Sequence, residues 1–267
     1  MALLSRDLDQ SDFKTFSEMA YNLAGIELNE TKRHLVISRL IRRVRALKLK
    51  DLAEYRKYLQ NNQAQEKTHF VNAITTNLTF FFREEHHFQT LSQHIQENHI
   101  QQPRIWSAAC STGQEPYSIA ITLAELGIST NSVLSTDIDT QCVETASQGV
   151  YREEDIKSID LEIARKHFLK GSGRNAGTVK VKPHLRSMVD FAQVNLLDTL
   201  PDGPFDAIFC RNVFIYFDIE TQMNIVLRFA KRLAPGGLLF LGHSELLRPP
   251  EDLFSLCGKT TFQRVGS

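Results

Sequence analysis

The sequence predicts an α/β fold: a mainly parallel sheet with helices on both faces, an all-helical region in front, and a small antiparallel β insertion. Three observations predict this fold. Residues 1–84 show helical spacing of apolar side chains, and from residue 85 helices alternate with short apolar strands. Between about 150 and 190 a glycine-rich turn and alternating valines and lysines interrupt the alternation. We therefore predict a helical domain at 1–84 and an α/β domain at 85–267, with the insertion at about 150–190.

Length and composition set broad limits on what this chain does. Its 267 residues suit one large or two small domains, and its formal net charge of zero indicates no partner. No run of eighteen apolar residues and no signal peptide are present, so we expect a cytoplasmic protein without membrane insertion. The cysteines stand far apart without a C-x-x-C pair, which favours free thiols and no metal site. They are Cys110, Cys142, Cys210 and Cys257.

The first 84 residues predict a series of helices. Residues 12–23 have a 3.6-residue apolar period, and Gly25 is placed to end that helix. Further helices are expected at 29–49 and 51–60, and the polar residues 61–66 predict a loop.

The second of these helices is strongly basic. Eight lysines and arginines lie from Lys32 to Lys50, and no acidic residue falls between these two. A solvated helix face is one interpretation, but exposed helices usually interleave charges of both signs. Cations without counter-charge favour a docking face for an acidic partner, whether protein, nucleic acid or membrane. The candidate docking residues are Arg39, Arg42 and Arg43.

The α/β region follows as a series of alternating elements. Helices are expected at 85–98, 117–126 and 220–233, and strands at 105–109, 132–136, 189–197, 207–210, 238–242 and 260–265, with an antiparallel edge at the end of the series.

Residues 104–120 read as strand, tight loop and helix, the arrangement at which open α/β sheets bind ligands. Gly113 permits a positive φ in the loop. The loop has a single glycine and no Gly-Lys-Ser/Thr ending, which argues against dinucleotide and P-loop sites. Glu115 would repel a pyrophosphate but favour a cationic ligand. An ordinary buried turn is the alternative.

A second acidic residue follows the next strand. Asp137 lies 24 residues after Gly113, about where nucleoside-binding folds place the acid that binds ribose. It would otherwise cap the following helix, but Asp139 or Thr140 can take that role.

Polar residues also follow two later strands, at Asn195 and at Arg211-Asn212. Charged groups at the end of a buried strand are costly unless they act there. With the two acids they predict a site for a nucleoside with a positively charged tail. S-adenosylmethionine fits, since it carries an ammonium and a sulfonium.

The sequence resembles the CheR family of chemotaxis receptor-glutamate methyltransferases over essentially its whole length. Each matching segment is weak alone, but their combination in this order is highly specific. The segments are 76–84, 109–118, 136–139, 194–196, 211–217 and 242–245. The resemblance implies a Rossmann-like S-adenosylmethionine methyltransferase sheet. It also implies transfer of the methyl group to glutamate side chains on the cytoplasmic domains of membrane chemoreceptors, leaving S-adenosylhomocysteine. We expect a monomer.

The resemblance also implies roles for individual residues. The cofactor contacts it implies are Asn77, Thr79, Arg83, Glu115, Asp137, Asn195, Leu196, Arg211 and Asn212. Arg83 and Tyr216 would lie beside the methyl group, where Arg83 orients the incoming carboxylate and Tyr216 hydrogen-bonds it. A glutamate with a reference pKa of about 4.3 is already ionised at neutral pH and needs no general base. We therefore expect no catalytic histidine or cysteine, and a structural role for His243.

The insertion suggests a second contact with the receptor. Residues 171–182 read as a hairpin with an apolar and a basic face, and a free strand edge can bind an extended peptide. The alternative is an insertion without a binding role, in which the lysines only protect an exposed strand edge from aggregation. Family members with a full-length glycine loop here bind an acidic, aromatic C-terminal receptor peptide. The corresponding candidates are Gly173, Arg174, Lys180 and Lys182.

Two other classes of function compete with this interpretation. A nucleic-acid methyltransferase would use the basic helix on phosphate, but amino-methylating enzymes usually carry Asp/Asn-Pro-Pro-Tyr/Phe after the fourth strand. This chain has Cys-Arg-Asn-Val at 210–213, so we expect no nucleic-acid partner. A non-catalytic cofactor sensor is disfavoured because Arg83 and Tyr216 are both present.

Overall fold

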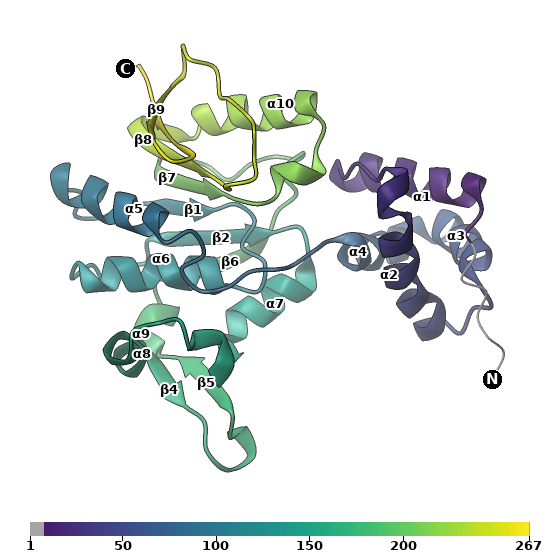
Figure 1. Cartoon of the computed structure of the whole chain (residues 1–267), viewed down its shortest axis with the longest axis horizontal. Coiled ribbons are helices and arrows are strands. Elements are labelled where there is room, and N and C mark those ends of the chain that lie inside the picture. The colour runs from purple at the N-terminus through teal and green to yellow at the C-terminus, as the bar shows by residue number, and fades with distance from the viewer. Residues whose placement is uncertain (1–7, 267) are drawn as a thin grey trace.

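The computed structural model describes residues 8–266. Figure 1 shows helices α1–α4 gathered on the right of a central sheet, and a small separate sheet containing β4 and β5 below it. The order of elements confirms the predicted mainly parallel α/β sheet, the all-helical N-terminal region and the small antiparallel insertion. No helix among residues 8–266 is long and apolar enough to cross a membrane.

The helical region has its own apolar core. Its helices are α1 (Gln10–Ala24), α2 (Arg33–Ala46), α3 (Leu52–Asn61) and α4 (Gln63–Ile74). Phe16 lies at the centre of this core and stacks against Tyr55 and Phe70 with ring centroids 6.0 Å apart. As predicted, Gly25 ends α1, in a left-handed conformation with φ 69°.

Two sequence expectations for these helices were wrong. The second helix is shorter than 29–49, because a 3₁₀ turn η1 (Glu30–Lys32) precedes α2 and the helix ends at Ala46. The loop expected at 61–66 is mostly helix, since α4 starts at Gln63. The polar first turn of α4 concealed a helix whose later residues Phe70 and Ile74 are buried.

Seven strands form the central sheet in the order β6-β2-β1-β7-β8-β10-β9. Their bounds are β1 Ile105–Ser107, β2 Val133–Asp137, β6 Val189–Gln193, β7 Phe205–Cys210, β8 Leu233–Leu241, β9 Phe254–Gly258 and β10 Thr261–Arg264. The first five in this order pair in parallel, and β10 and β9 form the expected antiparallel edge. Chain order reverses at β1, which lies between β2 and β7, and ligands bind beside such a switch point.

Helices cover both faces of the sheet because successive strand side chains point to opposite sides. The longer helices beside the strands are α5 (His86–Glu97), α6 (Gln114–Glu125), α7 (Thr140–Gln148) and α10 (Ile219–Ala230), and the short α9 (Pro183–Arg186) precedes β6. Ile105 belongs to the apolar cluster that contains residues of α5 and α6, whereas the next residue, Trp106, packs edge-on against Phe229 of α10.

The insertion is a three-stranded antiparallel sheet in the order β3-β5-β4. Its strands are β3 (Val150–Arg152), β4 (Phe168–Lys170) and β5 (Thr178–Val181). The free edge expected along residues 178–182 was wrong, because β5 is the central strand and pairs on both sides. The outer strands have three residues each, too few to show a period in the sequence.

Candidate functional site

A cavity opens at the carboxyl ends of β1, β2, β6 and β7, where the helical region meets the sheet. The ten residues predicted to bind the cofactor or to act on the methyl group all line it. They are Asn77, Thr79, Arg83, Glu115, Asp137, Asn195, Leu196, Arg211, Asn212 and Tyr216. The helical region adds an apolar wall of Ala24, Ile26 and Ile74.

Asp137 stands at the end of β2 with 8% of its surface exposed. Its Oδ2 accepts the Ser111 N–H at 2.8 Å, and its Oδ1 accepts the Asp139 N–H at 2.9 Å. Burial raises the pKa of Asp137 to about 6. As predicted, Asp139 caps α7, accepting the Gln141 N–H at 2.9 Å. Asp137 is thereby left to face the cavity.

The loop after β1 depends on a glycine. Gly113 has φ 95°, and a Cβ there would lie 2.6 Å from Tyr151 Oη and 2.8 Å from Ala146 Cβ. Any other residue would push the loop away from its neighbours. Glu115 follows in the first turn of α6, where its Oε1 accepts the Ser107 hydroxyl at 2.8 Å. Burial raises the pKa of Glu115, although Arg211 and Ser107 oppose that shift.

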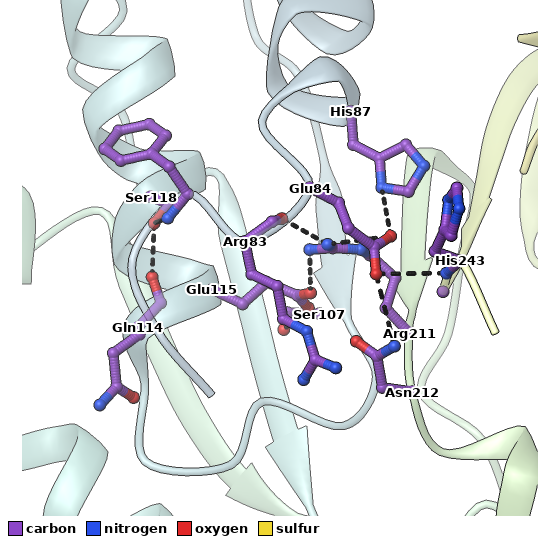
Figure 2. Close-up of polar contacts among 12 residues, drawn as sticks. Arg83, Glu84, His87, Ser107, Gln114, Glu115, Ser118, Arg211, Asn212 and His243 are labelled. Atoms are coloured by element: carbon purple, nitrogen blue, oxygen red, sulfur yellow. Dashed lines mark hydrogen bonds and ion pairs between the residues drawn. The ribbon is translucent and has the colours of Figure 1, made fainter. Parts of the chain in front are cut away.

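Arg211 joins two buried carboxylates, and we call Glu84, Arg211 and Glu115 the Arg211 cluster. Its Nη1 donates to Glu115 Oε2 at 2.9 Å, and its Nη2 lies 3.3 Å from Glu84 Oε2. Nη2 also donates to the Arg83 carbonyl oxygen. Figure 2 shows this guanidinium surrounded by partners from its own chain. With 1% of its side chain exposed, Arg211 holds protein groups in place as well as lining the cavity.

Arg83 and Tyr216 reach the cavity from different elements. Arg83 donates from Nη1 to the Leu78 carbonyl at 2.9 Å, and its guanidinium lies 5.7 Å from the Phe80 ring centroid. Tyr216 ends a 3₁₀ turn, η4 (Phe214–Tyr216), and its carbonyl accepts the Glu27 N–H at 2.8 Å. Tyr216 thus links the sheet to the helical region.

Asn195 makes a similar link. Its side-chain amide donates to the Leu23 carbonyl at 3.0 Å, and its Oδ1 accepts the Leu197 N–H at 3.1 Å. Its side chain therefore secures the end of α1 against the loop after β6.

Sequence reasoning missed two acids that shape the site, Glu84 and Glu245. Glu245 is 6% exposed and accepts the N–H groups of Val213 and Phe214, each at 2.8 Å, and that of Gly242. It thereby fixes the turn that carries Tyr216. Neither acid stands out in the sequence, because Glu84 lies among charged residues and histidines and Glu245 follows His243 and Ser244.

The basic face of α2 is partly neutralised, so the expectation of cations without counter-charge was wrong. Arg43 forms a bidentate pair with Glu66 of α4, with both N–O distances 2.8 Å. Arg39 donates to the Ile74 carbonyl at 2.6 Å, to the Thr75 carbonyl, and to Thr76 Oγ1 at 2.9 Å. Arg42, in contrast, is exposed.

The candidate peptide residues lie in and beside the loop before β5. Gly173 begins a 3₁₀ turn, η3 (Gly173–Asn175), and both Gly173 and Arg174 are exposed. Lys180 projects from the exposed side of β5, whereas Lys182 donates from Nζ to the Arg165 carbonyl at 2.7 Å.

Comparisons with known proteins identify the family of this chain. Residues 77–263 match the family described as CheR methyltransferase, SAM binding domain, and residues 11–75 match CheR methyltransferase, all-alpha domain. The chain belongs to the CheR methyltransferase family. It is therefore an S-adenosylmethionine-dependent methyltransferase with a cofactor-binding α/β domain.

Curated relatives align over almost the whole chain. The "Chemotaxis protein methyltransferase" of Escherichia coli is 47% identical over 96% of this chain and 91% of its own length. The protein of the same name from Salmonella typhimurium is 47% identical over 96% of this chain and 90% of its own. Among solved structures, the alignment with the N-methyltransferase NodS of Bradyrhizobium japonicum covers 61% of this chain and 62% of NodS. Its identity is 17% and its TM-score 0.37, too low to add to the argument.

The residues around the cavity fit S-adenosylmethionine. Its sulfonium and ammonium outweigh its carboxylate, so the molecule carries one net positive charge at neutral pH. Glu115 and Asp137 supply two carboxylates to the lining, and Asp137 is mostly ionised at pH 7 with its pKa at about 6. Opposite charges at short range in a partly buried site attract strongly. The glycine at 113 keeps the intervening loop close to the strand end.

Proposed function

We propose that this protein transfers a methyl group from S-adenosylmethionine to glutamate side chains on the cytoplasmic domains of membrane chemoreceptors, forming glutamyl methyl esters. The observation that carries the proposal is that one cavity gathers two carboxylates, Glu115 and Asp137, and two groups suited to bind a substrate carboxylate, Arg83 and Tyr216. Relatives at 47% identity that are named chemotaxis protein methyltransferases support it.

The reaction asks for positioning more than for acid–base chemistry. S-adenosylmethionine supplies an electrophilic methyl group on its sulfonium. A substrate glutamate is already a carboxylate at neutral pH, so the chain needs no base to activate it. Correct alignment of two reactants can lower a barrier by about 7–11 kcal/mol. Arg83 would orient the carboxylate, Tyr216 would hydrogen-bond it, and the wall of Ala24, Ile26 and Ile74 would exclude water.

The proposed cofactor contacts follow the lining of the cavity. Asp137 would accept from the ribose hydroxyls, and Glu115 would face the positively charged tail. The other proposed contacts are Asn77, Thr79, Arg83, Leu196, Asn212, Asn195 and Arg211. The side chains of Asn195 and Arg211 already bind other segments of the protein. They would therefore contact the cofactor only through atoms that those hydrogen bonds do not use.

The proposed receptor contacts lie on two surfaces. The acidic receptor helices that carry the substrate glutamates would dock on α2, where Arg42 and Arg45 are exposed. Arg39 and Arg43 would support that surface through their contacts to α4 and the segment after it. A receptor tail peptide would bind beside Gly173 and Arg174 along an outer strand of the small sheet, because β5 is already paired on both sides.

One experiment tests the reaction itself. The protein is incubated with tritiated S-adenosylmethionine and chemoreceptor-containing membranes, and the labelled product is then treated with alkali. Volatile methanol released by base is the expected result, because a glutamyl methyl ester hydrolyses whereas N-methyl groups do not. Parallel reactions use DNA and RNA as acceptors and Asp137→Ala protein as the control. Alkali-stable label, or label in nucleic acid alone, would contradict the proposal.

A further inference from the structure

The segment that carries Arg83 has an unusual backbone. Phe82 has φ 54° and Glu84 has φ 56°, so residues in the left-handed region flank Arg83 on both sides. A bulky residue such as phenylalanine rarely adopts this region. Each such residue is strained and persists only where surrounding contacts enforce it. Contacts around residues 82–84, which we call the Arg83 turn, should therefore be numerous.

Contacts from three elements do hold the Arg83 turn. The Phe82 N–H donates to Ser118 Oγ of α6 at 2.9 Å. The Arg83 carbonyl accepts from Arg211, which follows β7. Glu84 Oε1 accepts the His243 N–H, after β8, at 3.2 Å. Figure 2 shows the Arg83 carbonyl facing Arg211 while the Arg83 guanidinium extends away from the Arg211 cluster.

Glu84 is the residue of the Arg83 turn whose side chain makes the most of these contacts. Its Oε1 also lies 3.4 Å from Asn212 Nδ2, and its Oε2 lies 3.3 Å from Arg211 Nη2. Burial alone would raise the pKa of Glu84, but Arg211 and the neighbouring donors hold it below its ordinary value. Glu84 is therefore a carboxylate at neutral pH, and it ties the Arg83 turn to the ends of β7 and β8.

His87 extends this arrangement to the edge of the sheet. Its side chain is fully buried, with Nδ1 3.6 Å from Glu84 Oε2 and Nε2 3.0 Å from the Lys259 carbonyl and 3.1 Å from Thr260 Oγ1. Burial, and then the positive charge of Arg211, lower the pKa of His87 to about 4. A neutral His87 leaves Arg211 as the cation that balances Glu84 here.

We propose that Glu84 is a positioning residue for methyl transfer. By fixing the strained Arg83 turn from within the protein, it directs the Arg83 guanidinium into the cavity. Glu84 itself does not line the cavity. This inference rests on the proposed role of Arg83 in orienting the substrate carboxylate.

The first test measures the Arg83 turn without any reaction. Hydrogen exchange of the backbone amides of residues 80–88 is compared in cofactor-free wild type, Glu84→Gln and Glu85→Gln. Glu85 is the matched control, because it is the next residue and is exposed. We expect Glu84→Gln to speed exchange in this segment by about tenfold, through easier local opening, and Glu85→Gln to leave it unchanged. Equal protection in all three proteins would overturn the proposal.

The second test is a double-mutant cycle on turnover. Single-turnover rates with saturating cofactor and receptor are measured for Glu84→Gln, Arg83→Ala and the double variant. Glu84→Gln should lower the rate by about 10²-fold, the effect of misplacing a reacting group by about 1 Å. If Glu84 acts through Arg83, the double variant should match Arg83→Ala within about twofold. Equilibrium affinity for S-adenosylmethionine confirms that each variant retains its cavity.

Each other outcome is decisive. A full additional loss in the double variant would show a general structural role for Glu84 and overturn the proposal. If Arg83→Ala lowers the single-turnover rate but Glu84→Gln does not, the positioning role of Glu84 is overturned while the role of Arg83 stands. A normal Arg83→Ala would overturn the proposed role of Arg83 and this inference with it, while the exchange result would still report on the turn.

A second variant covers the case in which Glu84→Gln does not fold. Ser118→Ala removes the acceptor of the Phe82 N–H and leaves the buried charges in place. It should slow turnover by about tenfold, through one lost hydrogen bond, and have no further effect in the Arg83→Ala background. Unchanged turnover in Ser118→Ala would then overturn the proposal.

Discussion

Two groups of arginines, one on α2 and one around the cavity, look alike in the sequence and behave differently in the fold. In each group at least one arginine holds a carboxylate of the protein and at least one is more exposed to solvent. On α2, Arg39 and Arg43 bind the end and the side of α4, whereas Arg42 is exposed. At the cavity, Arg211 is buried among carboxylates while Arg83 lines the opening.

The difference between the groups lies in solvent access. Glu84 and Glu115 are mostly buried with Arg211, so loss of that cation would leave two carboxylates without a counter-charge. Charges in such an environment interact far more strongly than charges in water. On α2, Arg43 holds the buried Glu66, whereas Arg42 is exposed and its interactions are weakened by solvent. The same residue type should therefore have its largest effect on stability at the cavity and its smallest on α2.

The largest expected effect is that of Arg211→Met. Removing one partner of a buried ion cluster typically costs about 3–5 kcal/mol, because the remaining charges are uncompensated. Urea unfolding should show that loss in the free energy of unfolding, whereas the control Arg42→Met should change it by less than about 0.5 kcal/mol. Equal effects of the two substitutions would remove the distinction between the regions.

Arg83→Ala comes next and acts on turnover. The cation lies at the cavity opening, so the protein should stay folded and bind S-adenosylmethionine while the methylation rate falls by about 10²-fold, as expected for loss of substrate alignment. Initial rates at saturating cofactor and receptor measure this effect. Near-normal turnover would show that Arg83 has no essential part in the reaction.

Asp137→Ala should weaken cofactor binding rather than stability. Loss of charge-assisted hydrogen bonds to the ribose should cost about 1–3 kcal/mol of binding free energy. Calorimetric titration with S-adenosylmethionine measures this, and unchanged affinity would remove Asp137 from the site.

Affinity for S-adenosylmethionine should also depend on pH through Asp137. Because burial raises its pKa from 3.8 to about 6, the carboxylate becomes protonated as pH falls through about 6. Affinity should then decline by up to about tenfold per pH unit below that value, and Asp137→Asn should abolish the step. The opposite sign holds for folding of the cofactor-free protein, whose stability from this group is present below about 4 and lost as pH rises to about 6.

Arg42 should have the smallest effect, confined to receptor binding. Replacing Arg42 and Arg45 with glutamate should raise KM for receptor, increasingly at low salt, because exposed charges are screened over about 8 Å at physiological ionic strength. Affinity for S-adenosylmethionine should stay unchanged. Arg39→Glu is the informative comparison, since it breaks contacts to Ile74 and Thr75, which line the cavity, and should weaken cofactor binding. A salt-independent KM would point to another surface.

The sequence pattern by itself determined the α/β architecture and the strand-end members of the cavity lining, whereas Asn77, Thr79, Arg83, Leu196 and Tyr216 were assigned from the family resemblance. Both depend on local features, namely apolar periodicity, a glycine with positive φ, and polar residues directly after strands. Parallel strands bring their carboxyl ends to one edge, so residues as distant as Asp137 and Asn212 could be assigned to one site without coordinates.

Only the tertiary structure decided which charges are balanced and which strand edges are free. Glu66 neutralises Arg43 from 23 residues away, and Arg211 reaches the carbonyl of Arg83 from 128 residues away. Strand β5 is central because two three-residue strands flank it. Such pairings depend on distance in space between segments without a period or motif of their own, so the sequence pattern carries no signal for them.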